Sequence, residues 1–237
     1  MINSAEQFLS LVDRQIAEKH LLKHDFYRAW TLGKLSKECL QEYAKHYYQH
    51  VKAFPTYLAA LLFHAEDPDT RKKLLVNLVE EEGGVPNHPE LWKRFTLRLG
   101  VTEEELAGHT PNDEIKKLIE SFKKVCLQET VLAGIAALYA YESQIPEICI
   151  SKIAGLKENY EMSTPEDWEY FRVHIEADKE HAAVEKELMA RHYSSVNAES
   201  ALRSVGIILD HLWDFLSSLC QRYQIGCSQE LCEKSIV

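Results

Sequence analysis

The chain has 237 residues, of which 46% are hydrophobic, so it is long enough for one large domain with a substantial buried core. Its 27 basic and 37 acidic side chains give a formal net charge of −10. That balance argues against nucleic acid as a partner and leaves no basic stripe for a membrane of anionic lipid. Small molecules or proteins are the partners that it favours.

Helical periodicity runs through most of the sequence. Ser4 is placed to cap the first helix, and an aromatic segment follows it at residues 21–30. Pro55 lies inside the second helix, where we expect a kink, and Gly83-Gly84 ends the third. The predicted helices span residues 5–19, 36–61, 70–82, 87–99, 112–126, 130–143, 165–191 and 198–223, with a capped turn at 102–105.

The alternation of apolar and polar residues that is typical of strands is missing, so the sequence predicts an all-α fold with seven to nine helices. The longest mainly apolar run, residues 131–140, is too short to span a bilayer and predicts a buried helix, bent at Pro146 and continuing to residue 156. We predict a single helical domain over residues 1–225 and a flexible tail over 226–237.

The N-terminus has no basic stretch followed by an apolar run, so no secretory signal is expected. Without such a signal, cysteines that form no C-x-x-C pair indicate reduced thiols in a cytoplasm. Three of them are expected in or near the core, and three lie near the C-terminus, where a disulfide or adventitious metal binding stays open. The six are Cys39, Cys126, Cys149, Cys220, Cys227 and Cys232.

His174, Asp178 and His181 recur at positions i, i+4 and i+7 of the helix predicted for residues 165–191. At about 100° per residue these positions share one face of an α-helix. Two imidazoles and a carboxylate suit iron, manganese or zinc better than calcium or magnesium. The alternative is an ordinary solvated face, because charged residues lie between the three.

Three further residues extend this candidate metal site. Glu81 ends a helix, and His88 follows it across the Gly83-Gly84 break, which allows the chain to return His88 toward the same cavity. Glu142 lies on an otherwise apolar helix with no base nearby in sequence, and a buried carboxylate needs a cation. Six such ligands match the needs of two divalent metal ions.

Each of these three residues also has an ordinary explanation. In these alternatives, Glu142 pairs with an arginine or a lysine, His88 caps its helix, and Glu81 is one of three solvated acids. The combination of all six is therefore more specific than any member.

The pattern E-x6-H, then E, then H-x3-D-x2-H, resembles the heme-oxygenase-like di-metal oxidases, which are related to TenA and PqqC. Further runs are similar to a branch of that family, the Chlamydia proteins associating with death domains, and the likeness covers about residues 5–220. These runs are residues 24–27 (HDFY), 52–55 (KAFP), 86–88 (PNH), 136–139 (AALY) and 141–146 (YESQIP).

The resemblance implies a compact seven-helix fold with a non-heme metal pair, Fe/Fe or Fe/Mn, that uses dioxygen and an external reductant. It implies a role in making para-aminobenzoate for folate, with Tyr27 of the chain itself as the source of the ring and Lys152 as the source of the amine. By position, Tyr43, Tyr141 and Tyr170 match further tyrosines near the site.

The resemblance also implies a homodimer and a bacterial cytoplasmic location, with secretion into a host cell as a further option. An alternative function is binding of host death-domain proteins, with or without the enzyme activity. Among other enzymes of this fold, a thiaminase-type hydrolase is disfavoured because no cysteine lies between Cys126 and Cys149. A cofactorless oxidase would not need six ligands. Heme binding through His20 or His24 stays open by analogy of fold.

Overall fold

A computed structural model describes residues 2–226 of the chain, and this part is helical apart from turns and loops. The helices are α1 (Ala5–Glu18), α2 (Asp25–Thr31), α3 (Lys37–His64), α4 (Pro68–Gly83), α5 (His88–Arg98), α6 (Glu103–Ala107), α7 (Asp113–Gln128), α8 (Val131–Glu142), α9 (Ile145–Asn159), α10 (Glu169–His192) and α11 (Ala198–Arg222), with 3₁₀ turns at Leu21–Lys23 and Pro165–Asp167.

The predicted all-α class is confirmed, but the described residues hold more than seven helices. Nine of them have eleven residues or more, and α2 and α6 are shorter. The predicted bend at Pro146 is instead a complete break, because the chain leaves α8 at Ser143 and α9 starts afresh with Pro146 in its first turn. Likewise Thr164 caps only a 3₁₀ turn, and α10 begins at Glu169.

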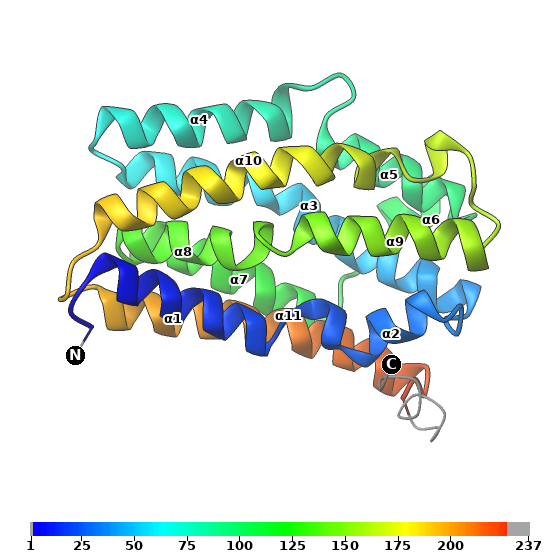
Figure 1. The fold of residues 1–237 in the computed structure, drawn as a ribbon. Coiled ribbons are helices and arrows are strands. Elements are labelled where there is room, and N and C mark those ends of the chain that lie inside the picture. Colours follow the sequence, from blue (N-terminus) through cyan, green and yellow to red (C-terminus); the bar gives the residue numbers. More distant parts are fainter. Residues whose placement is uncertain (1, 227–237) are drawn as a thin grey trace.

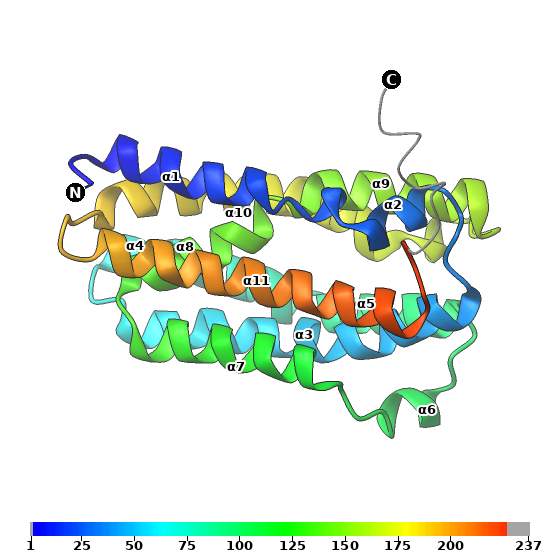
Figure 2. The same ribbon diagram turned by 90° about the horizontal axis from the view of Figure 1, so that it is seen from below.

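Helix α8 is the centre of the bundle. Every residue from Leu132 to Glu142 is buried, so all of its faces pack against other helices. It packs against α10 on one side and against α11 and α7 on others. Figure 1 shows α4 on the side of α10 that faces away from α1 and α11. Figure 2 shows α3 and α7 together on one side of α11, with the short α6 at the edge of the molecule.

Close packing between helices explains two of the glycines. A Cβ atom on Gly134 of α8 would lie 2.7 Å from a methyl carbon of Leu61, and a Cβ on Gly155 of α9 would lie 2.6 Å from the ring of Trp30. These glycines therefore let α8 approach α3 and let α9 approach α2. The second approach brings Lys152, one turn before Gly155, into the core.

Three cysteines, Cys39, Cys126 and Cys149, are buried without a disulfide, as predicted. Of the predicted tail at 226–237 only Gly226 is described, so Cys227 and Cys232 lie outside the described residues. Within residues 2–226, no helix has both the length and the apolar character needed to cross a membrane.

Candidate metal centre

The six residues predicted as metal ligands come together in two groups of three. The first group is Glu81, His88 and His174, and the second group is Glu142, Asp178 and His181. Within each group the potential ligand atoms lie within 4.8 Å of one another, and all six side chains are buried.

Four helices supply these side chains. Glu81 lies in the last turn of α4, and His88 is the first residue of α5, so the glycine break between them returns the chain to the same cavity. Glu142 ends α8. Helix α10 contributes His174 to the first group and Asp178 and His181 to the second. His174 and His181 are separated by roughly 10 Å along the helix axis, so the three residues predicted as one face of a single site serve two groups.

Hydrogen bonds to the imidazoles define which nitrogen of each is left for a metal. The Nδ1 atom of His174 lies 2.7 Å from the carbonyl oxygen of Tyr170, so it donates there and leaves Nε2 free. In His181 the roles are reversed. Its Nε2 donates to Glu80 Oε2 at 2.8 Å, and its Nδ1 faces Glu142 Oε1 at 3.1 Å and Asp178 Oδ1 at 3.5 Å.

The charges of the second group are those of a cation site. Burial is the main cause that raises the pKa of Asp178 to about 7; the hydrogen bond with His181 opposes it, and the carboxylates of Glu142 and Glu81 add to it. Burial on its own lowers the pKa of His181, but the carboxylates of Asp178 and Glu142 outweigh it and raise that pKa to about 11. Buried carboxyl groups thus gather around one imidazole, an arrangement that a divalent cation stabilises.

Buried carboxylate oxygens without hydrogen-bond partners also indicate a cation site. Glu142 Oε2 and Asp178 Oδ2 are buried and receive no hydrogen bond from the described residues. Leaving a buried carboxylate oxygen unpaired is expensive unless a cation binds it. Mixed imidazole and carboxylate donors suit iron and manganese. The two groups therefore fit two metal ions.

The space between the groups is small. It measures about 10 Å³, roughly what one water molecule needs. It is lined by Val51, Phe54, Glu81, Tyr141, Glu142, Tyr170, His174 and Asp178. Two of the predicted tyrosines, Tyr141 and Tyr170, thus reach the cavity, and the ring centroid of Tyr170 lies 4.0 Å from that of His174.

The other predicted residues form a second buried cluster around Lys152. The Nζ atom of Lys152 donates a hydrogen bond of 2.6 Å to the hydroxyl of Tyr43, whose oxygen lies 3.4 Å from that of Tyr27. Lys152 is 3% exposed, and its Nζ lies 5.4 Å from the ring centroid of Tyr27. Burial lowers the pKa of Lys152 to about 7, so a large part of the amine is neutral near neutral pH.

Tyr47, which was not predicted as a site residue, joins the two clusters. Its hydroxyl lies 2.7 Å from that of Tyr141 at the metal cavity, and its ring stacks on Tyr43 with centroids 5.4 Å apart. In the sequence, its spacing of four residues from Tyr43, about one helical turn, is the feature that could have identified it as a site residue. Glu80 was also missed, because the run Glu80 to Glu82 does not tell which acid faces His181.

The two histidines considered for heme have other roles. His20 caps the 3₁₀ turn, and its ring lies near Glu147. His24 caps α2 and shares a hydrogen bond with Ser217. Both side chains are thus used in local structure at the start of α2.

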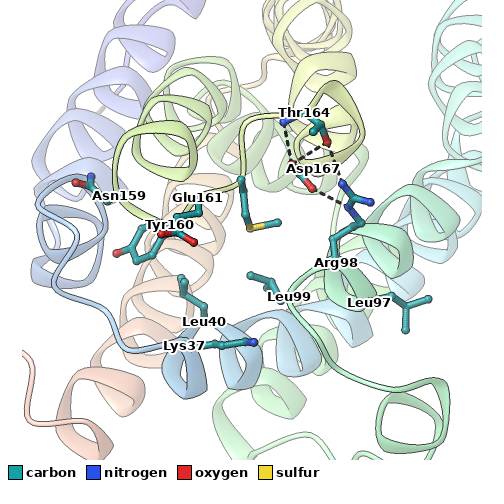
Figure 3. A pocket seen from close by; sticks show the side chains of 11 residues that line it. Lys37, Leu40, Leu97, Arg98, Leu99, Asn159, Tyr160, Glu161, Thr164 and Asp167 are labelled. Atoms are coloured by element: carbon teal, nitrogen blue, oxygen red, sulfur yellow. Dashed lines mark hydrogen bonds and ion pairs between the residues drawn. The ribbon is translucent and has the colours of Figure 1, made fainter.

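A separate hollow of about 760 Å³ lies where the ends of α5 and α9 meet the start of α3. Figure 3 shows Arg98 directed at Asp167 and Thr164 on its rim, with Leu40 and Leu99 facing its interior. It shares no residue with the metal groups or with the Lys152 cluster.

Comparisons with known proteins agree with this geometry. Residues 41–212 match the iron-containing redox enzyme family. A Chlamydia pneumoniae protein named 4-aminobenzoate synthase is 46% identical over 89% of this chain and 94% of its own length. A Nitrosomonas europaea protein of the same name is 37% identical over 96% of this chain and 95% of its own length.

Among solved structures, a domain from Shewanella denitrificans with a heme-oxygenase-like fold superposes with a TM-score of 0.77. It is 16% identical and covers 96% of this chain and 97% of its own, so it bears on the fold alone. The predicted heme-oxygenase-like architecture is confirmed. By its sequence match and its relatives, the chain belongs to the iron-containing redox enzyme family and is an oxidoreductase.

Proposed function

We propose that this chain makes 4-aminobenzoate in an oxygen-dependent reaction, with two metal ions, iron in both groups or iron in one and manganese in the other. The observation that carries the proposal is the buried amine of Lys152 among Tyr27 and Tyr43, beside the two metal groups. The names of relatives 37–46% identical over nearly their full length support the same product.

The substrate in this proposal is the protein itself. Tyrosine and 4-aminobenzoate share a ring with one carbon substituent and a heteroatom opposite to it. Conversion of Tyr27 therefore requires cleavage of its Cα–Cβ bond, oxidation of Cβ to a carboxylate, and replacement of the phenol oxygen by a nitrogen. Dioxygen with an external reductant supplies the oxidation. The cavity of about 10 Å³ supports this reading, because it has no room for an added aromatic substrate.

The residues of the chain prepare this chemistry in three ways. Tyr43 holds the Lys152 amine at 2.6 Å, and the surrounding rings exclude water from it. Burial keeps part of the amine neutral, which is the form that attacks carbon. The contact of Tyr47 with Tyr141 gives the phenols a connected path to the metal cavity. When bound, the metal ions supply oxidising power from dioxygen.

An isotope experiment tests this function. Protein labelled with ring-¹³C tyrosine and ¹⁵N lysine is loaded anaerobically with iron, or with iron and manganese, and then given dioxygen and a reductant. We expect 4-aminobenzoate that carries both labels, and none when dioxygen is left out. Absence of product under all metal loadings contradicts the function, and unlabelled product contradicts the self-derived ring and amine.

Replacement of Lys152 by methionine is expected to abolish the product and to stabilise the fold. The pKa of Lys152 is about 7 when folded, against about 10.4 for an unfolded lysine. Between these values the unfolded chain binds more protons, so the lysine's contribution to stability rises with pH. Lys152→Met removes the cost of burying the charge, which is roughly 2–4 kcal/mol near pH 7.

Urea unfolding at pH 7 and pH 9.5 measures this effect. The excess stability of Lys152→Met should shrink as the pH rises. Equal stability differences at both pH values would show that the amine is not titrating with a lowered pKa.

Two partner predictions, a homodimer and host death-domain proteins, stay predictions that rest on the resemblance.

A further inference from the structure

Glu185 is a buried acid that the proposed function leaves unused. It lies on α10 one turn beyond His181 and is 2% exposed. Its carboxyl group interacts with that of Glu142, on the facing helix α8. With Asp178 and His181 it forms an i, i+3, i+7 set on one face of α10.

Acceptor oxygens without donors are concentrated around this residue. Both carboxylate oxygens of Glu185 are buried and receive no hydrogen bond from the described residues. The same is true of Glu142 Oε2, Asp178 Oδ2 and Asn77 Oδ1. The Nδ2 atom of Asn77 donates a hydrogen bond of 3.0 Å to the other oxygen of Glu142.

These five oxygens outnumber the nearby donors. His181 is the one member of the second group that can donate N–H hydrogen bonds, and its Nε2 is already taken by Glu80. A single proton shared between Glu142 and Glu185 would satisfy only one oxygen pair. A metal ion satisfies several oxygens at once, since oxygen-rich sites commonly bind a cation through several carboxylates.

We propose that Glu185 is a further ligand of the second group, which then binds its metal through one imidazole and three carboxylates. The proposal rests on the two metal ions of the proposed function. Glu185 contacts Glu142 rather than the whole group in this structure, so ligation turns its flexible side chain toward the space shared by Glu142, Asp178 and His181.

This ligand widens the chemical difference between the two groups. The first group keeps two imidazoles and one carboxylate. The second group has a harder and more anionic set of donors, which favours manganese over a softer competitor and stabilises a metal in a higher oxidation state. The second group is therefore the expected manganese site when both metals are offered.

The competing role for Glu185 is that of a neutral acid that donates a hydrogen bond to Glu142. The variant Glu185→Gln separates the two, because an amide has nearly the same shape and still donates such a bond but is a poor ligand. Glu187→Gln is the matched control, since Glu187 lies two residues away on α10, is exposed, and pairs with Lys73.

The experiment titrates each metal-free protein with Mn²⁺ and follows free Mn²⁺ by electron paramagnetic resonance. We expect two ions per chain in the wild type and in Glu187→Gln. In Glu185→Gln one ion should bind as before and the other about tenfold or more weakly. Wild-type binding of both ions by Glu185→Gln would overturn the proposal.

Thermal unfolding gives a second measurement. Saturating Mn²⁺ should raise the unfolding temperature less in Glu185→Gln than in the wild type and in Glu187→Gln, because the variant binds the second ion more weakly. An equal rise in all three proteins would mean that Glu185 is not a ligand. Glu185→Asp keeps the charge and should bind the second ion more tightly than Glu185→Gln, and equal affinities of the two variants also overturn the proposal.

Failure of the proposed function has a different signature. A wild type that binds fewer than two ions removes the two-metal site and this proposal with it. Two ions in both the wild type and Glu185→Gln leave the function intact and remove only the role of Glu185.

Discussion

Replacing Tyr27 by phenylalanine is expected to abolish formation of 4-aminobenzoate while leaving the fold and both metal groups in place. The phenylalanine ring lacks the phenol oxygen that activates the ring for one-electron oxidation and that the nitrogen replaces. Little stability should be lost, because the Tyr27 hydroxyl makes one long contact, 3.4 Å to Tyr43, and the ring itself is retained. Product formation and the intact mass of the protein after reaction measure the outcome.

The variant Tyr57→Phe is a close control for this experiment. Tyr57 is also buried, and its hydroxyl makes a contact of the same length, 3.4 Å to His50. It lies outside the cluster around Lys152, so Tyr57→Phe should retain the product and the loss of side-chain mass at Tyr27. Full product from Tyr27→Phe would move the source of the ring to another tyrosine, and Tyr43 would be the next candidate.

The six residues that gather in the two groups were predictable because helix geometry and burial cost act on short stretches of sequence. The spacing of His174, Asp178 and His181 follows from the pitch of a single helix. Glu142 stands out because an acid on an apolar helix needs a cation. The spacing alone does not show that the residues of α10 divide between two groups. That division depends on Glu142, which approaches from α8, and on His88, which approaches from α5.

Residues that act through contacts between helices gave weaker signals. Glu80 and Glu185 look like ordinary acids in the sequence, and only the packing of α4 and α8 against α10 brings them to His181 and Glu142. Tyr47 is one of eleven tyrosines, and its contact with Tyr141 joins residues 94 positions apart.

The division of helices was predicted less well for a similar reason. A proline in the first turn is as compatible with a new helix as with a bend, and Pro146 proved to start α9. Pro55, in contrast, lies inside the continuous α3. The local sequence around each proline does not determine which outcome the surrounding packing selects.

Replacing Glu142 by alanine is expected to remove one metal ion per chain and to abolish the product. Glu142 Oε1 lies 3.1 Å from His181 Nδ1 and accepts a hydrogen bond from Asn77, so its loss takes away one ligand and the contact that orients another. Because the first group draws on α4, α5 and α10 but not on α8, its metal should remain. His174→Ala should do the reverse and empty the first group.

Metal content measured after anaerobic iron loading tests both variants, with Glu147→Ala, an exposed acid on α9, as the control. One metal ion per chain in each variant and none in the double variant would establish two separable groups. Loss of both metals in either single variant would instead mean that the ions bind cooperatively, because α10 carries ligands of both groups. Unchanged metal content in Glu142→Ala and His174→Ala contradicts the metal centre itself, and with it the oxidative route from Tyr27 to product.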